Sequence, residues 1–220
     1  MKIDFVSDVS CPWCAVGLNA LEQALARVAP DIQATLHFQP FELNPQMPGE
    51  GQDIVEHLSA KYGIDAQQIA ANAEAIRQRG ASVGFEFGIG KRSRIYNTFD
   101  AHRLLHWAGL QSEAAQRALK HALFKAYFTD GLSPGDAEVL VAAATAAGLD
   151  TDAARAVLAS DDFAAEVREA EGFYQQQGIH SVPAVIVNDR HLISGGQPVE
   201  VFERALRHIA QEETQGETAA

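Results

Sequence analysis

The sequence predicts an α/β protein in which both ends of the chain build one sheet around an all-helical insertion. Three observations predict this fold. A strand–helix–strand unit opens the chain, an Ala-rich block of helical periodicity follows, and a β-hairpin and a helix close it. The 220 residues are 47% apolar and 21% charged, a composition typical of a globular protein that can bury a sizeable core.

The N-terminal unit has a clear pattern of strand, helix and strand. Residues 2–6 are β-branched and aromatic, which favours a strand. A helix that ends near Pro30 follows, since apolar residues recur every three or four positions from Leu18 to Val28. Residues 34–38 indicate a second strand. We expect the two strands to be parallel and joined by a right-handed crossover.

The C-terminal part predicts an antiparallel hairpin and a last helix. Two β runs, 184–187 and 190–193, flank a two-residue Asn-Asp turn. The last helix begins with Pro198 at its first position, and a polar tail follows from Gln211. Between the two ends, residues 53–147 are helical in period.

The glycine-rich stretch from Gly80 to Gly90 interrupts the helical block. With Lys91 it resembles a phosphate-binding loop only superficially, because no glycine stands five places before Gly90 and Arg92 replaces the required Ser or Thr. We expect a mobile connection here. Trp107, which lies among leucines, is expected in the core.

The net charge restricts the partners. Seventeen Lys and Arg against 29 Asp and Glu give a charge of −12, which repels nucleic acid and anionic lipid. No stretch approaches the roughly 20 apolar residues of a membrane helix, and Met1 runs directly into the first strand without the pattern of a signal peptide. We therefore expect a cytoplasmic protein.

The only two cysteines form the sequence Cys11-Pro12-Trp13-Cys14, where the first strand passes into the first helix. Pro12 suits the first helical position, which places Cys11 at or near the N-cap. The positive end of the helix dipole favours the thiolate there, so Cys11 is predicted to be the nucleophile. Cys14 continues the apolar face of the helix one turn deeper and is predicted to be the resolving thiol.

A structural disulfide and a zinc site are two alternatives to a redox-active cysteine pair. A structural disulfide that closes a ring of four residues stabilises the fold by about 2 kcal/mol, against about 4.7 kcal/mol for a hundred-residue loop. This small stabilisation favours a redox-active disulfide over a structural one. Half of a zinc site is the stronger rival, because His102 and His106 are four residues apart on one helix. Pro12 and Trp13 are atypical of zinc knuckles.

Together with this motif, residues 178–184, Gly-Ile-His-Ser-Val-Pro-Ala, resemble the DsbA-like branch of the thioredoxin superfamily. Residues 41–45 and 94–102 are similar, more narrowly, to FrnE-type proteins, a cytoplasmic subgroup. The match spans about residues 2–210. It implies a thioredoxin-like fold with an inserted all-helical domain.

The resemblance also implies domain boundaries and a substrate-binding element. The thioredoxin-like domain would comprise residues 1–48 and 160–212, the helical insertion 49–159, and a polar C-terminal tail 213–220. In the family the proline before the third strand is cis and packs against the cysteine pair, which here assigns Val182 and Pro183. A Val182 backbone turned outward could pair with an extended peptide or glutathione. From the residues alone, an ordinary proline at the start of a strand is the preferred interpretation of Pro183.

The sequence departs from the family pattern at two positions. Pro12-Trp13 lacks the histidine that DsbA has between its cysteines, and Ser181 replaces a common glycine before Val182. A related subgroup, the glutathione-dependent hydroxychromene-carboxylate isomerases and kappa-class transferases, typically has serine in place of Cys11. The complete cysteine pair argues against that chemistry.

Further candidate substrate-binding residues come from the subgroup-like segments. Asn44, Tyr96, Asn97 and His102 would line the cleft between the domains, although helix caps and polar core contacts also explain these residue types. Trp13 would either contact substrate from the rim of the site, beside Pro12, or pack on the insertion.

The sequence thus predicts a thiol–disulfide oxidoreductase of the DsbA family. Its partner would be a disulfide- or thiol-containing protein or peptide, or glutathione, and it would act as a monomer or homodimer. No bound cofactor or metal is expected, with glutathione as a candidate co-substrate. A glutathione-dependent isomerase or transferase is the alternative, and a zinc-binding module without activity is the third hypothesis.

Overall fold

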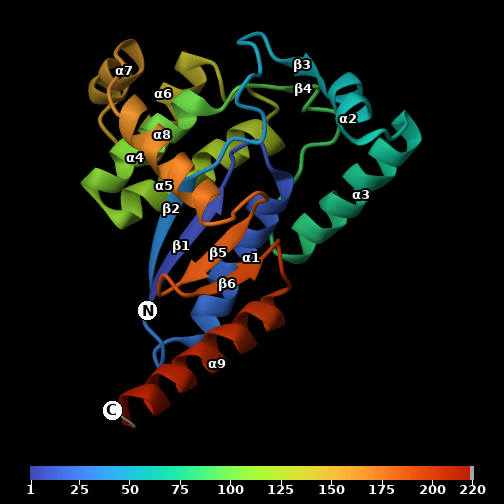
Figure 1. Ribbon diagram of the computed structural model, residues 1–220. Coiled ribbons are helices and arrows are strands. Elements are labelled where there is room, and N and C mark those ends of the chain that lie inside the picture. The colour runs from blue at the N-terminus through green and yellow to red at the C-terminus, as the bar shows by residue number, and fades with distance from the viewer. Residues whose placement is uncertain (219–220) are drawn as a thin grey trace.

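The computed structural model describes residues 1–218 (Figure 1). Its main sheet has the order β2-β1-β5-β6, formed by Thr35–Pro40, Lys2–Ser7, Ala184–Val187 and His191–Ser194. Strands β1 and β2 are parallel, β5 is antiparallel to β1, and β6 is antiparallel to β5. Both ends of the chain therefore build one sheet, as predicted.

The connection between β5 and β6 has three residues, one more than predicted, because Val187 pairs with His191 and Arg190 lies outside the second strand. Asn188 and Asp189 have φ values of 51° and 55°, the left-handed pair required by a tight hairpin turn whose twist matches that of the strands. Asparagine and aspartate tolerate this conformation better than other residues with side chains.

Helices cover both faces of the sheet. Because side chains alternate along a strand, Phe5 and Val185 face the core shared with α1 (Pro12–Val28) and α9 (Val199–Thr218). Val6 faces the other way and packs with Tyr174 of α8 (Ala164–Gln176). Helix α9 continues past Gln211 through Thr218, so the expected polar tail is largely helical. Its Gln and Glu residues are good helix formers, which explains the extension.

The insertion between β2 and α8 is mainly helical. Its helices are α2 (Ile54–Tyr62), α3 (Ala66–Ser82), α4 (Phe99–Gln111), α5 (Glu113–Phe124), a π-helical turn (Lys125–Thr129), α6 (Ala137–Ala146) and α7 (Thr151–Ala159). The expectation of an all-helical insertion is wrong in one detail. Gln52–Asp53 (β3) pairs with Arg94–Ile95 (β4) in a small antiparallel sheet, which is too short to produce a periodic pattern.

The two parts of the chain share a core. Val83, Phe85, Phe124 and Phe128 of the insertion belong to the same hydrophobic cluster as β1, α1 and α9. The glycine-rich stretch expected to be a mobile connection is therefore anchored, because the buried Phe85 packs edge-on against Phe128. Trp107 is buried in a second cluster within the helices, as predicted.

Helix α5 holds the insertion onto the free edge of β2. The Leu36 N–H donates to Glu113 Oε1 at 2.7 Å, and the Phe38 N–H donates to Gln116 Oε1 at 3.0 Å. The Gln116 Nε2 in turn donates to the Phe38 carbonyl at 3.1 Å. Side chains thus satisfy backbone groups that an edge strand otherwise exposes. Within residues 1–218, no helix is long and apolar enough to cross a bilayer.

Candidate active site

The cysteine pair lies at the start of α1. Pro12 is the first helical residue, and Cys11 is the N-cap, with an extended backbone at φ −89° and ψ 113°. This agrees with the arrangement predicted from the sequence. The Cys11 side chain makes no capping hydrogen bond, so its sulfur is not committed to the helix terminus.

The two sulfurs differ in access and surroundings. Cys11 is 4% exposed and Cys14 is fully buried, and both are free thiols. The Cys11 Sγ lies 3.6 Å from the Val182 carbonyl oxygen, and the Val182–Pro183 peptide bond is cis. Trp13 is 41% exposed beside them. The structure therefore brings the two sequence-predicted segments, 11–14 and 182–183, into one site.

Two glycines allow this close approach. A Cβ atom on Gly17 would lie 3.1 Å from Pro183 Cγ, and one on Gly196 would lie 2.9 Å from the Trp13 carbonyl oxygen. The loop after β6 therefore packs directly on the backbone of the first turn of α1, which fixes Trp13 and the cysteines relative to Pro183.

We expect Gly196→Ala to lower the free energy of unfolding by about 1–3 kcal/mol, because the added methyl group overlaps the Trp13 backbone. Gly172→Ala is the matched control. A Cβ at Gly172, inside α8, meets no atom within 4 Å, so this change should stabilise by roughly 0.5–1 kcal/mol. Urea unfolding of both variants measures the difference, and equal effects would contradict the tight packing.

A buried carboxylate, Asp8, lies three residues before Cys11. It accepts hydrogen bonds from the Ser10 N–H (2.9 Å) and hydroxyl (2.9 Å), the Leu43 N–H (2.7 Å) and the Thr98 hydroxyl (2.8 Å). Burial alone would raise the pKa of Asp8, but the nearby His102 ring and the two N–H groups lower it overall. Asp8 is therefore a poor base that organises the loops around it.

Lys120 of α5 is the buried cation of the site. It is 0% exposed, and its Nζ has no hydrogen-bond partner among the residues the structure describes. Burial lowers the pKa of Lys120 from 10.5 to about 8, although the charges of Cys14, Asp8 and Cys11 oppose this. Conversely, burial and the neighbouring Cys11 sulfur raise the pKa of Cys14 well above its usual value, while Lys120 lowers it. The lysine and the buried thiol are thus electrostatically coupled.

The Lys120 pKa predicts a pH-dependent stability. The unfolded chain binds more protons than the folded one between about pH 8 and pH 10.5, so the free energy of unfolding should rise across this range. Across this pH range, the free energy of unfolding of the wild-type protein should rise by up to roughly 3 kcal/mol relative to that of Lys120→Met. Chemical denaturation of both proteins at several pH values measures this gain. A difference that stays constant with pH would contradict the assignment.

Three other predicted residues have structural contacts. The Asn44 Oδ1 accepts from Lys61 Nζ at 2.8 Å. The Asn97 Oδ1 accepts from the Phe99 N–H at 2.9 Å at the start of α4. The partly buried Tyr96 ring packs against Tyr127. The contacts of Asn97 and Tyr96 match the alternative of caps and core packing, whereas that of Asn44 is an exposed side-chain hydrogen bond. A role in substrate binding stays a prediction for all three.

His102 is the fourth of these residues and lies deepest. It is 2% exposed, and its Nε2 is 3.7 Å from Asp8 Oδ1, too far for a hydrogen bond. The described part of the chain holds no cluster of three or more His, Cys, Asp or Glu side chains suited to a metal ion.

Asp8 and Lys120 are not among the site residues predicted from the sequence. A signal for Lys120 was present, because it lies on the inward stripe of α5 between Gln116 and Phe124, where a charged residue is out of place. Asp8 comes between an apolar strand and the cysteine motif. A charged residue between two segments expected to be buried is the signal that could have indicated it.

Comparisons with known proteins identify the family of the chain. Residues 2–207 match the family described as DSBA-like thioredoxin domain. A probable DsbA oxidoreductase from Streptomyces coelicolor superposes with a TM-score of 0.90 at 35% identity, covering 96% of this chain and 91% of that one.

Two solved structures of lower identity share the fold. A 2-hydroxychromene-2-carboxylate isomerase has a TM-score of 0.69 at 18% identity, with 98% of each chain covered. The cytosolic disulfide reductase DsbM from Pseudomonas aeruginosa, solved with GSH, has a TM-score of 0.66 at 14% identity, with 96% of this chain and 100% of that one covered. The extent of the family match shows that this chain belongs to the DSBA-like thioredoxin domain family of oxidoreductases.

Proposed function

We propose that the protein is a thiol–disulfide oxidoreductase with Cys11 as the nucleophile and Cys14 as the resolving thiol. One observation carries this proposal. Cys11 lies at the N-terminus of α1 with its Sγ 3.6 Å from the Val182 carbonyl, while Cys14 is buried one turn further along the same helix. The 35% identity to a probable DsbA oxidoreductase supports it.

The reaction consists of two exchange steps. The Cys11 thiolate attacks one sulfur of a substrate disulfide, forms a mixed disulfide and releases the other sulfur as a thiolate. The Cys14 thiol then loses its proton and attacks the Cys11 Sγ, which releases the second substrate thiolate and leaves a Cys11–Cys14 disulfide. The substrate gains two electrons and the cysteine pair loses two, and the oxidising direction is the reverse.

Lys120 is the candidate acceptor of the Cys14 proton, because the charges of the two groups shift each other's pKa. The resolving step requires a Cys14 thiolate, and burial disfavours that charge. A lysine with a pKa of about 8 has a neutral fraction near neutral pH, whereas the lowered pKa of Asp8 makes it a weak base. Lys120 would then hold the proton and its charge would stabilise the thiolate.

The substrate would lie along the Val182 backbone, between Pro183 and the exposed ring of Trp13, with Pro12 at the rim. Glutathione is the candidate co-substrate, since DsbM of the same fold was solved with GSH. This relationship also supports the proposed cytoplasmic location.

We assign the chain to the FrnE-type subgroup. The two segments that carry this resemblance, 41–45 and 94–102, converge on one carboxylate. The Leu43 N–H and the Thr98 hydroxyl both donate to Asp8. The two subgroup-like segments thus stabilise the loop that precedes the cysteines. Proposed substrate contacts from these segments are Asn44, Tyr96, Asn97 and His102.

The second candidate is a glutathione-dependent isomerase or transferase, favoured by the fold shared with 2-hydroxychromene-2-carboxylate isomerase. In that case Cys11 would orient the glutathione thiol and Cys14 would have no chemical role. Turnover that survives Cys14→Ser would favour this candidate over the dithiol mechanism.

A glutathione redox titration tests the proposal. The purified protein is equilibrated at fixed ratios of reduced to oxidised glutathione, and the thiol state of Cys11 and Cys14 is read by alkylation and mass. We expect one two-electron transition between dithiol and intramolecular disulfide. A pair that stays reduced at every ratio, or that only accumulates a stable glutathione adduct, would overturn the proposal.

A further inference from the structure

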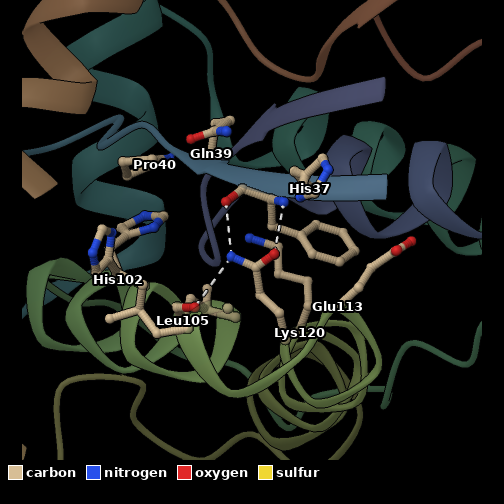
Figure 2. A pocket seen from close by; sticks show the side chains of 12 residues that line it. His37, Gln39, Pro40, His102, Leu105, Glu113 and Lys120 are labelled. Carbon is tan, nitrogen blue, oxygen red and sulfur yellow. Dashed lines mark hydrogen bonds between the residues drawn. The ribbon is translucent and has the colours of Figure 1, made fainter. Parts of the chain in front are cut away.

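A pocket with a volume of about 300 Å³ lies between β2 and the helices α4 and α5 (Figure 2). None of residues 11–14 or 182–183 lines it, although Lys120, which is electrostatically coupled to Cys14, does. Its volume is at the lower end for a small-molecule site. The pocket is therefore a candidate site for a small ligand.

Two buried nitrogen groups line this pocket without a hydrogen-bond partner in the described chain. These are Lys120 Nζ from α5 and His102 Nε2 from α4. Figure 2 shows both side chains at the pocket, reaching it from neighbouring helices. A buried polar atom without a partner is costly, which indicates that a partner is missing.

Asp8 does not supply that partner. Its oxygens are occupied by four donors from Ser10, Leu43 and Thr98, and His102 stays 3.7 Å away. The Glu113 carboxylate at the pocket is also engaged, since its Oε1 accepts from the Leu36 N–H. Among the described residues, Lys120 Nζ and His102 Nε2 therefore have no hydrogen-bond acceptor, and a bound anion would supply one.

The nitrogen groups of the lining favour an anion. Besides Lys120 and His102, two further imidazoles, His37 and His106, line the pocket, and Glu113 is its one acidic residue among those described. With a pKa of about 8, Lys120 is mostly charged at neutral pH.

Part of the remaining wall is apolar. Phe38, Leu105 and Leu110 line it, and Leu110 is 63% exposed at the surface. A small inorganic anion would leave this wall in contact with water. A ligand with an apolar body would cover it, which stabilises binding through the hydrophobic effect.

We propose that this pocket binds a small organic carboxylate whose anionic group lies against Lys120 and His102 and whose apolar body lies against Leu105 and Leu110. The proposal goes beyond the thiol chemistry and does not depend on it. The binding involves no covalent step.

Calorimetric titration of the intact protein with benzoate tests the proposal. Benzamide, which has the same shape without the charge, is the matched control, and inorganic phosphate is the control for a plain oxyanion site. We expect benzoate to bind at least about tenfold more tightly than benzamide, because of the charge-assisted hydrogen bonds. Equal affinities, or phosphate binding as tight as that of benzoate, would overturn the proposal.

Two sets of variants locate the binding. Lys120→Met should abolish the preference for benzoate over benzamide. At the exposed position 110, Leu110→Lys should strengthen benzoate binding and Leu110→Glu should weaken it, each severalfold, without disturbing the core. Benzoate affinity that is unchanged in all three variants would contradict the site. Because calorimetry does not require exchange activity, failure here is distinguishable from failure of the proposed function.

Discussion

Cys11→Ser should lower the rate of thiol–disulfide exchange by roughly three orders of magnitude or more. A serine hydroxyl is not ionised near neutral pH and is a far weaker nucleophile toward a disulfide than a thiolate. The buried Cys14 cannot replace it, because it is fully inaccessible whereas Cys11 lies beside the Val182 backbone. The reduction rate of a disulfide-linked fluorescent peptide measures this loss.

The loss of activity must not reflect unfolding. Cys11 makes no capping hydrogen bond in α1, so its replacement by serine should change the free energy of unfolding by about 1 kcal/mol or less. A folded Cys11→Ser variant that keeps exchanging at a rate near that of the wild-type protein would contradict the assignment of the nucleophile.

Asp8→Ala should destabilise the protein by about 3–5 kcal/mol. The change removes the acceptor of four hydrogen bonds and leaves the donors of Ser10, Leu43 and Thr98 buried without partners. It also removes the negative charge near Lys120. Urea denaturation measures the loss. Asp31→Ala on the exposed surface removes the same charge and is the matched control, and it should change the free energy of unfolding by no more than about 0.5 kcal/mol.

The contribution of Asp8 should depend on pH in one direction. Because its pKa is lower in the folded protein than the usual 3.8, its stabilising contribution is present above pH 3.8 and is lost as the pH falls through the folded value. The stability difference between wild type and Asp8→Ala should therefore shrink at acid pH. A difference that grows on acidification would contradict the assignment.

Local patterns in the sequence predict the elements that hold the cysteines. The strand before Cys11, the proline at the first position of α1 and the Asn188-Asp189 turn each depend on neighbours in the chain, so the fold and the cysteine geometry follow from them. The two-residue strands β3 and β4 leave no periodicity and could not be predicted.

The two buried charged residues near the cysteines, Asp8 and Lys120, are brought together by long-range packing. Asp8 and Lys120 are 112 positions apart, and each looks ordinary in its own segment. Only the docking of α5 on the edge of β2, through Glu113 and Gln116, brings the lysine to the buried thiol. No spacing rule in a single sequence encodes that contact.

The most direct test of the central claim uses the variant Cys14→Ser. Its intact mass is measured after incubation with a disulfide-linked model peptide. We expect one covalent peptide adduct per chain through Cys11, because the mixed disulfide forms and the resolving thiol is absent. Cys11→Ser under the same conditions should form none, since Cys14 is fully buried. No adduct on Cys14→Ser, or equal adducts on both variants, would contradict the dithiol mechanism.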